Sequence, residues 1–103
     1  MTVIAIRFSA NVKVGCMEKA LEMAKTFNQD VNGDYKGRIY TPAYGPPRNV
    51  LVWEDFWESI AEREAYWGKY FEKPEFLAWW DRFNELLEPG GSTEVWNVTE
   101  ISF

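Results

Sequence analysis

The chain of 103 residues contains no histidine. Histidine is the side chain whose ordinary pKa lies nearest to physiological pH, so its absence removes the usual imidazole general base and the commonest protein metal ligand. Nucleophilic sites of the Ser-His and Cys-His kinds are excluded for the same reason. The sequence also has no glycine-rich phosphate loop and no zinc-like spacing of cysteine with carboxylates. We therefore expect neither a metal nor another cofactor.

Cysteine and long apolar runs are also scarce. The one cysteine, Cys16, cannot form an internal disulfide, which favours a reducing, cytoplasmic location. No base lies beside it in the sequence, so we interpret it as a small buried or half-buried side chain and not as a reactive thiol. No apolar run approaches the ~20 residues of a membrane-spanning helix. The first ten residues lack the features of a secretory signal.

Positive charge is low and dispersed. Eleven basic residues against sixteen acidic ones give a formal net charge of −5, and the isoelectric point is about 4.7. Nucleic acids and anionic membranes are bound by clustered Lys and Arg, and no such stripe occurs here. The charge pattern therefore argues against both as main partners.

Aromatic residues, by contrast, are abundant. They make up 17% of the chain and include six tryptophans, which concentrates apolar area in a few large side chains. A chain this apolar can offset its ordering entropy by burial, so disorder is not expected. The length predicts a single domain over residues 1–103.

The residue pattern predicts four strands and three helices. Runs rich in β-branched and aromatic residues indicate strands, and apolar residues at helical spacing indicate helices. Asn32-Gly33 ends the first helix, and three prolines in residues 42–48 exclude a strand there. The predicted strands are 2–9, 35–41, 49–56 and 92–102, and the predicted helices are 17–31, 58–71 and 74–87, the last with a buried stripe of Phe76, Leu77, Trp80, Phe83 and Leu87.

This order, β-α-β-β-α(α)-β, is the split βαβ pattern. With right-handed crossovers it predicts an α+β fold of ferredoxin-like type. The expected architecture is a four-stranded antiparallel sheet with the helices on one face.

The strands do not alternate cleanly between apolar and polar residues, as those of a sheet covered on one face should. In the first strand, for example, Ile4, Ile6 and Phe8 share one face while Val3 and Ala5 share the other. Because the helices can cover only one face, we expect the second face to pack against another copy in a two-fold homodimer. The alternative is that long aromatic side chains shield this face in a monomer.

Three segments carry a resemblance to a known superfamily. Residues 12–15 lead into a helix start at 17–21, the aromatic strand 52–56 is followed by 59–64, and Glu94-Val95-Trp96 stands in the closing strand. These segments resemble the dimeric α/β-barrel superfamily, and most closely its NIPSNAP-like and antibiotic-biosynthesis-monooxygenase-like domains. The resemblance implies two sheets that form a barrel, with a cavity within the barrel or between sheet and helices.

That superfamily includes cofactor-free oxygenases, haem-degrading enzymes, isomerases and proteins of unknown role, so the resemblance does not fix the function. Haem-degrading relatives generally bind the haem iron through a histidine. The absence of histidine argues against that activity here.

Arg7 is the first candidate site residue, because an unpaired charge within an apolar strand is costly. On a structural interpretation, Arg7 pairs with a carboxylate across the dimer or extends to the rim of the sheet. On a functional one, it binds an acidic or carbonyl group of a ligand in a mostly apolar cavity. The other candidates for lining such a cavity are Tyr40, Trp53, Trp79, Trp96 and Asn97.

Trp79 is the most suggestive of these, because it falls off the predicted helix stripe, although any single tryptophan can equally be part of the core. Two carboxylate pairs, Glu54–Asp55 and Glu62–Glu64, are interpreted as surface charge. Adjacent strand residues point to opposite faces, and residues two apart on a helix do not meet.

The leading hypothesis is a small dimeric protein that binds a hydrophobic or aromatic small molecule, with one acidic group on the ligand. One alternative is a cofactor-independent oxygenase or isomerase of polycyclic aromatic substrates. Another is a structural or interaction module without a ligand.

Overall fold

The computed structural model describes residues 3–101. Its elements in chain order are β1 (Val3–Asn11), α1 (Met17–Lys25), α2 (Phe27–Val31), β2 (Arg38–Tyr40), β3 (Val50–Trp57), α3 (Ile60–Tyr70), α4 (Pro74–Asn84) and β4 (Ser92–Val98). The first and last predicted strands included Thr2 and Ser102, which lie outside the described residues. Within residues 3–101, no helix combines the length and the apolar character needed to cross a membrane.

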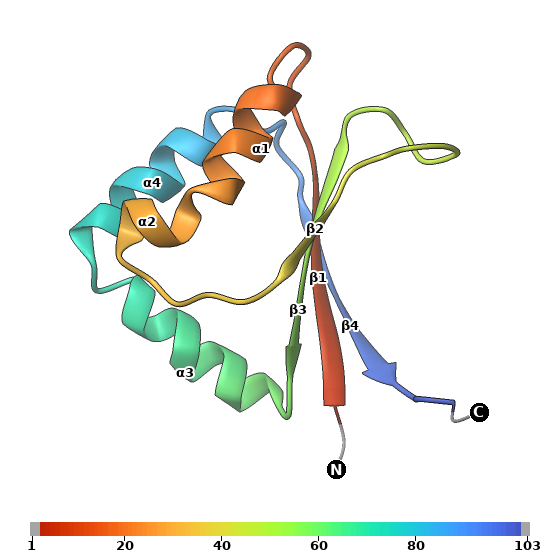
Figure 1. Cartoon of the computed structure of the whole chain (residues 1–103), viewed down its shortest axis with the longest axis vertical. Coiled ribbons are helices and arrows are strands. Elements are labelled where there is room, and N and C mark those ends of the chain that lie inside the picture. Colours follow the sequence, from red (N-terminus) through yellow and green to blue (C-terminus); the bar gives the residue numbers. More distant parts are fainter. Residues whose placement is uncertain (1–2, 102–103) are drawn as a thin grey trace.

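The four strands form one sheet in the order β2-β3-β1-β4, and each neighbouring pair is antiparallel. Figure 1 shows α1 to α4 together on one face of this sheet, with no helix on the other face. The predicted ferredoxin-like α+β architecture is confirmed. The proline-rich segment between β2 and β3 is a loop, as predicted, and projects beyond the sheet (Figure 1).

The first predicted helix is in fact two helices. The chain leaves the helical conformation at Thr26, where φ is −96° and ψ is 8°. The Thr26 hydroxyl donates a hydrogen bond to Asp30 Oδ2 at 2.7 Å, one of the local side-chain bonds by which Thr competes with helix continuation. Asn32 adopts a left-handed conformation, with φ of 52°, and ends α2 as predicted.

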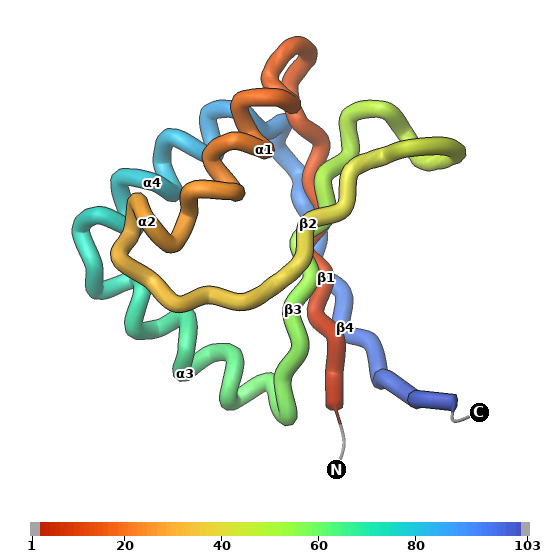
Figure 2. Tube along the Cα trace, in the orientation of Figure 1, coloured from red at the N-terminus to blue at the C-terminus, as the bar shows by residue number. Residues whose placement is uncertain are grey.

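The second strand is shorter than predicted, because residue 35 is held in the loop before it. Asn28 Nδ2 donates to the carbonyl oxygen of Tyr35, and Tyr35 N donates to Asn28 Oδ1, both at 2.8 Å. These bonds use the backbone groups that a sheet ladder would need. Figure 2 shows this segment crossing from α2 toward the sheet.

The buried side of α4 differs from the predicted stripe. Its buried residues are Phe76, Trp79 and Phe83, whereas Leu77 is 43% exposed and Trp80 is only partly buried. Trp79, predicted to lie off the stripe, is 1% exposed. It stacks on Phe83 at 4.7 Å between ring centroids and meets the edge of Phe27 at 4.8 Å. The break at Thr26 brings α2 against α4, and this contact selects the Trp79 side of the helix.

We predict that Phe83→Ala lowers the free energy of unfolding by about 3–5 kcal/mol, because Phe83 is fully buried. The measurement is urea denaturation followed by circular dichroism. Leu77→Ala on the same helix is the control and should cost less than about 1 kcal/mol. Similar losses for the two variants would contradict the helix orientation described here.

Candidate functional site

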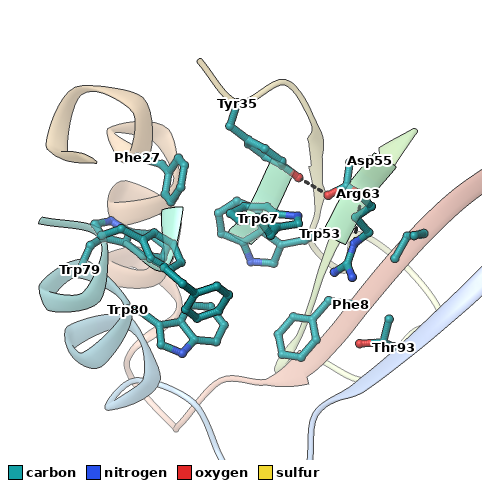
Figure 3. Close-up of a pocket in the computed structure, with 13 residues that line it drawn as sticks. Phe8, Phe27, Tyr35, Trp53, Asp55, Arg63, Trp67, Trp79, Trp80 and Thr93 are labelled. Atoms are coloured by element: carbon teal, nitrogen blue, oxygen red, sulfur yellow. Dashed lines mark hydrogen bonds and ion pairs between the residues drawn. The ribbon is translucent and has the colours of Figure 1, made fainter. Parts of the chain in front are cut away.

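A cavity of about 340 Å³ lies between the helices and the sheet. Its walls come from strands β1, β3 and β4, from helices α2 to α4, and from the loop that carries Tyr35 (Figure 3). The aromatic lining residues are Phe8, Phe27, Tyr35, Trp53, Trp67, Phe71, Phe76, Trp79 and Trp80, and the others are Ile6, Asp55, Arg63 and Thr93. The interior is therefore a predominantly aromatic surface with a few polar groups.

Strand alternation and helix spacing place these residues. In β3, Trp53 and Asp55 are two apart and thus share the helix-facing side. In α3, Arg63 and Trp67 are four apart and lie on one face, one turn from each other. Figure 3 shows Phe27, Trp79 and Trp80 on the helical side of the cavity and Asp55, Arg63 and Thr93 on the sheet side.

Asp55 is the centre of the polar group. Its Oδ2 accepts a hydrogen bond from the Tyr35 hydroxyl at 2.6 Å, and its Oδ1 accepts one from Trp57 Nε1 at 2.5 Å. Burial, together with the hydrogen bond to Asp55, raises the pKa of the Tyr35 hydroxyl far above its ordinary value. Tyr35 therefore remains protonated and acts as a donor.

Two buried donors in the cavity wall have no acceptor within the described part of the chain. They are Nε of Arg63 and Nε1 of Trp67. The distance from Arg63 Nε to Asp55 Oδ1 is 3.9 Å, which permits charge attraction but exceeds hydrogen-bond length. Residues 3–101 contain no cluster of three or more Cys, Asp or Glu side chains suited to a metal ion. The polar end of the cavity is thus built to donate hydrogen bonds.

The sequence interpretation missed this polar group. The interpretation of Glu54 and Asp55 as surface charge is wrong, because these residues are only 3% and 5% exposed. The assignment of adjacent residues to opposite faces was correct: Glu54 faces away from the helices and Asp55 faces the cavity. The sequence feature that could have indicated the burial of Asp55 is its spacing of two from Trp53, which puts both residues on the same face of the strand. The interpretation of Glu62 and Glu64 as surface charge is confirmed, because both are exposed.

The structure distributes the six predicted site residues over two faces of the sheet. Trp53 and Trp79 line the cavity. Arg7, Tyr40 and Trp96 lie together on the face opposite the helices. Asn97 is paired with Ile4 in the β1–β4 ladder, is exposed, and is not among the cavity-lining residues. The six residues do not surround one cavity, and ligand binding by any of them stays a prediction.

Arg7 finds its carboxylate partner within its own chain. Its Nε donates to Glu54 Oε2 at 2.5 Å, and the Tyr40 hydroxyl donates to Glu54 Oε1 at 2.8 Å. The guanidinium carbon lies 5.9 Å from the Tyr40 ring centroid and 6.0 Å from that of Trp96. Arg7 therefore pairs with a carboxylate, as the structural interpretation expects, but this carboxylate is Glu54 of the same chain and not a residue across a dimer.

This pairing controls the charge of Glu54. Burial alone would raise the pKa of the Glu54 carboxyl, but the hydrogen bonds from Arg7 and Tyr40 and the positive charge of Arg7 together lower it below its ordinary value. A lowered pKa means that the ionised carboxylate stabilises the fold above the ordinary pKa of about 4.3, and that this contribution is lost as the pH falls through the lowered pKa.

We predict that Arg7→Met raises the pKa of Glu54 above its ordinary value, because burial then acts without the main opposing partner. The measurement is a pH titration of the Glu54 carboxyl carbon by NMR. Arg48→Met, in the exposed loop after β2, is the control and should leave the titration unchanged. An unaltered Glu54 pKa in Arg7→Met would show that Arg7 does not hold this carboxylate ionised.

Fold and cavity together define a ferredoxin-like α+β protein with an aromatic cavity between sheet and helices. Among solved structures, the chain is similar to a NIPSNAP family protein from Agrobacterium tumefaciens, with a TM-score of 0.79, 17% identity, and coverage of 97% of this chain and 89% of that one. A second Agrobacterium protein, of the nipsnap family and of unknown function, gives a TM-score of 0.74 at 15% identity, covering 98% and 91%.

A putative antibiotic biosynthesis monooxygenase from Nitrosomonas europaea gives a TM-score of 0.68 at 14% identity, covering 93% of this chain and 89% of that one. The fold resemblance expected from the sequence is thus confirmed over nearly the whole chain. No protein-family model and no curated protein matches the sequence.

Proposed function

We propose that this protein binds an aromatic small molecule in the cavity between its helices and its sheet. The observation that carries the proposal is the combination of nine aromatic lining residues with a buried polar group in a cavity of about 340 Å³. Small-molecule sites are typically concave, mostly apolar and about 300–1,000 Å³ in volume, with a few polar groups that orient the ligand. The volume lies near the lower limit, which suits a ligand of roughly two or three fused rings.

The cavity walls support one another, which favours a preformed site. Phe27 meets Trp79 at 4.8 Å between ring centroids, Tyr35 meets Trp67 at 5.2 Å, and Trp53 meets Phe83 at 5.7 Å. Aromatic pairs at such spacings are favourable in themselves. A wall held by these contacts needs little reorganisation, so less binding energy is spent on ordering side chains.

The oxygenase or isomerase alternative has only fold similarity in its favour, and fold similarity does not determine chemistry. Binding is therefore the function that the cavity itself supports. The single, half-buried Cys16 is in keeping with the proposed cytoplasmic location.

We propose further that the protein is a homodimer joined through the sheet face opposite the helices. This open face, defined by Arg7, Tyr40, Phe56, Trp96 and Val98, presents large apolar side chains around the Arg7–Glu54 ion pair. Phe56 is 44% exposed, and the Arg38 guanidinium lies over its ring. Apolar surface of this kind is typical of interfaces, and two-fold dimers are the commonest oligomers.

We predict that Phe56→Asp converts a dimer into a monomer of 12.1 kDa, because it places a charge within the apolar surface of the proposed interface. Sedimentation equilibrium measures the mass. Tyr44→Asp is the control, since Tyr44 is 98% exposed in the loop after β2, and this variant should remain dimeric. A wild-type protein that sediments as a monomer would refute the dimer directly.

We predict that N-phenyl-1-naphthylamine, a neutral aromatic fluorophore, binds the protein and that Thr93→Trp weakens this binding by about tenfold or more, because the added indole fills cavity volume. Fluorescence titration gives the dissociation constants. Ala43→Trp, which adds the same indole to an exposed loop, is the control and should bind as the wild type does. Equal binding by all three proteins would place the fluorophore outside this cavity and contradict the proposal.

A further inference from the structure

In the cavity, the carboxylate oxygens have hydrogen-bond partners, whereas two of the donor nitrogens have none in the part of the chain that the structure describes. Its one carboxylate, Asp55, has a donor on each oxygen: the Tyr35 hydroxyl on Oδ2 and the Trp57 indole on Oδ1. Its two buried nitrogens, Arg63 Nε and Trp67 Nε1, have no acceptor among residues 3–101. Since a buried donor without an acceptor is costly, a ligand gains most by supplying acceptors to these nitrogens.

Arg63 is available for this role because Asp55 does not depend on it. The two nearest atoms of the pair, Arg63 Nε and Asp55 Oδ1, are 3.9 Å apart. Asp55 obtains its hydrogen bonds from Tyr35 and Trp57, which are uncharged. The guanidinium therefore keeps its planar set of N–H donors for another partner, and that set matches a carboxylate or a similar oxygen anion.

The two nitrogens are also placed to act together. Arg63 and Trp67 lie one helical turn apart on the same face of α3, and both line the cavity. Figure 3 shows Arg63 on the sheet side, beside Asp55, with Trp67 between it and the aromatic helical side. A planar ligand stacked among the rings can therefore direct a polar group toward α3.

We propose that the ligand is an aromatic acid, with a carboxylate or phenolate oxygen, and that Arg63 and Trp67 bind this oxygen. The inference rests on the proposed binding function and deepens it by naming the ligand class. It also assigns the cationic role in the cavity to Arg63, because Arg7 is paired with Glu54 on the other face of the sheet.

A cationic ligand is disfavoured by the same contacts. It would approach the positively charged guanidinium of Arg63, and both oxygens of Asp55 already accept one hydrogen bond each. A neutral hydrocarbon would fill the aromatic part of the cavity but would leave both nitrogens without acceptors. An acidic oxygen satisfies both donors and adds charge attraction.

The test compares three naphthalenes that differ in one substituent: 2-naphthoate, 2-ethylnaphthalene and 2-naphthylmethylammonium. Displacement of N-phenyl-1-naphthylamine at pH 7 gives their affinities. Hydrogen bonds to charged groups predict that the wild type binds 2-naphthoate about tenfold or more tightly than 2-ethylnaphthalene. The ammonium compound should bind more weakly than the naphthoate.

Two variants identify the residues responsible. Arg63→Met keeps the apolar stem and should reduce the preference for naphthoate to about twofold or less, with the affinity for 2-ethylnaphthalene almost unchanged. Trp67→Phe leaves Arg63 and Asp55 in place and keeps an aromatic ring at position 67. It should reduce the preference for naphthoate by about threefold, because the indole N–H is lost. Arg48→Met, in the exposed loop, is the control and should keep the wild-type preference.

The inference is overturned if the wild type binds 2-naphthoate no better than 2-ethylnaphthalene, if the ammonium compound binds best, or if Arg63→Met retains the full preference. In each case the naphthalenes still bind, so the proposed binding function survives. If none of the three compounds displaces the fluorophore, the ligand class is wrong, whereas the binding function is decided separately by the binding of the fluorophore to the wild type and to Thr93→Trp. Trp67→Phe decides the question on its own if Arg63→Met does not fold.

Discussion

The pleat of β3 places two consecutive buried carboxylates on opposite faces of the sheet. Glu54 faces away from the helices and is held by Arg7 and Tyr40, whereas Asp55 faces the helices and is held by Tyr35 and Trp57. Each carboxylate is buried, so each needs donors on its own side. The position of Tyr35, the conformation of Arg7 and the polar end of the cavity all follow from this requirement.

The same aromatic residues both build the hydrophobic core and form the cavity wall. Phe27, Trp53 and Trp79 belong to the core or pack against it, and they also line the cavity. Rigid rings can bridge neighbours across a space that flexible aliphatic chains would fill. This explains how a chain of 103 residues can keep a cavity of about 340 Å³ beside its core.

Much of the fold could be predicted from periodicity, and the errors have physical causes. The faces of β1 and the opposite orientations of Glu54 and Asp55 in β3 were assigned correctly, because alternation needs only local information. The break at Thr26 is accompanied by local hydrogen bonds of its hydroxyl, the shortest of them to Asp30, and buried Trp79 packs against Phe27 of α2. Both features depend on contacts in three dimensions. The spacing of apolar residues along the sequence does not show where a helix breaks or which of two apolar sides of α4 is buried.

The candidate site was less accessible, because its polar residues come from separate segments. Trp53 and Trp79 were identified as aromatic candidates, but Asp55 and Arg63 were not. Charged residues in a sequence are usually solvated, so the interpretation as surface charge followed the usual rule. Only the register of β3 against β1 and the placement of α3 bring these charges into an aromatic cavity.

The pair of hydrogen bonds between Asn28 and the backbone of Tyr35 has a consequence for the mobility of one cavity wall. The segment between α2 and β2 has no regular secondary structure, and such segments usually exchange their amide hydrogens quickly. Here the Tyr35 amide is bonded to a helix residue, and the Tyr35 side chain is bonded to a buried carboxylate. Local opening of this wall must break both bonds, so in the proposed binding function the rate at which a ligand leaves past this wall would depend on Asn28, a residue that does not line the cavity.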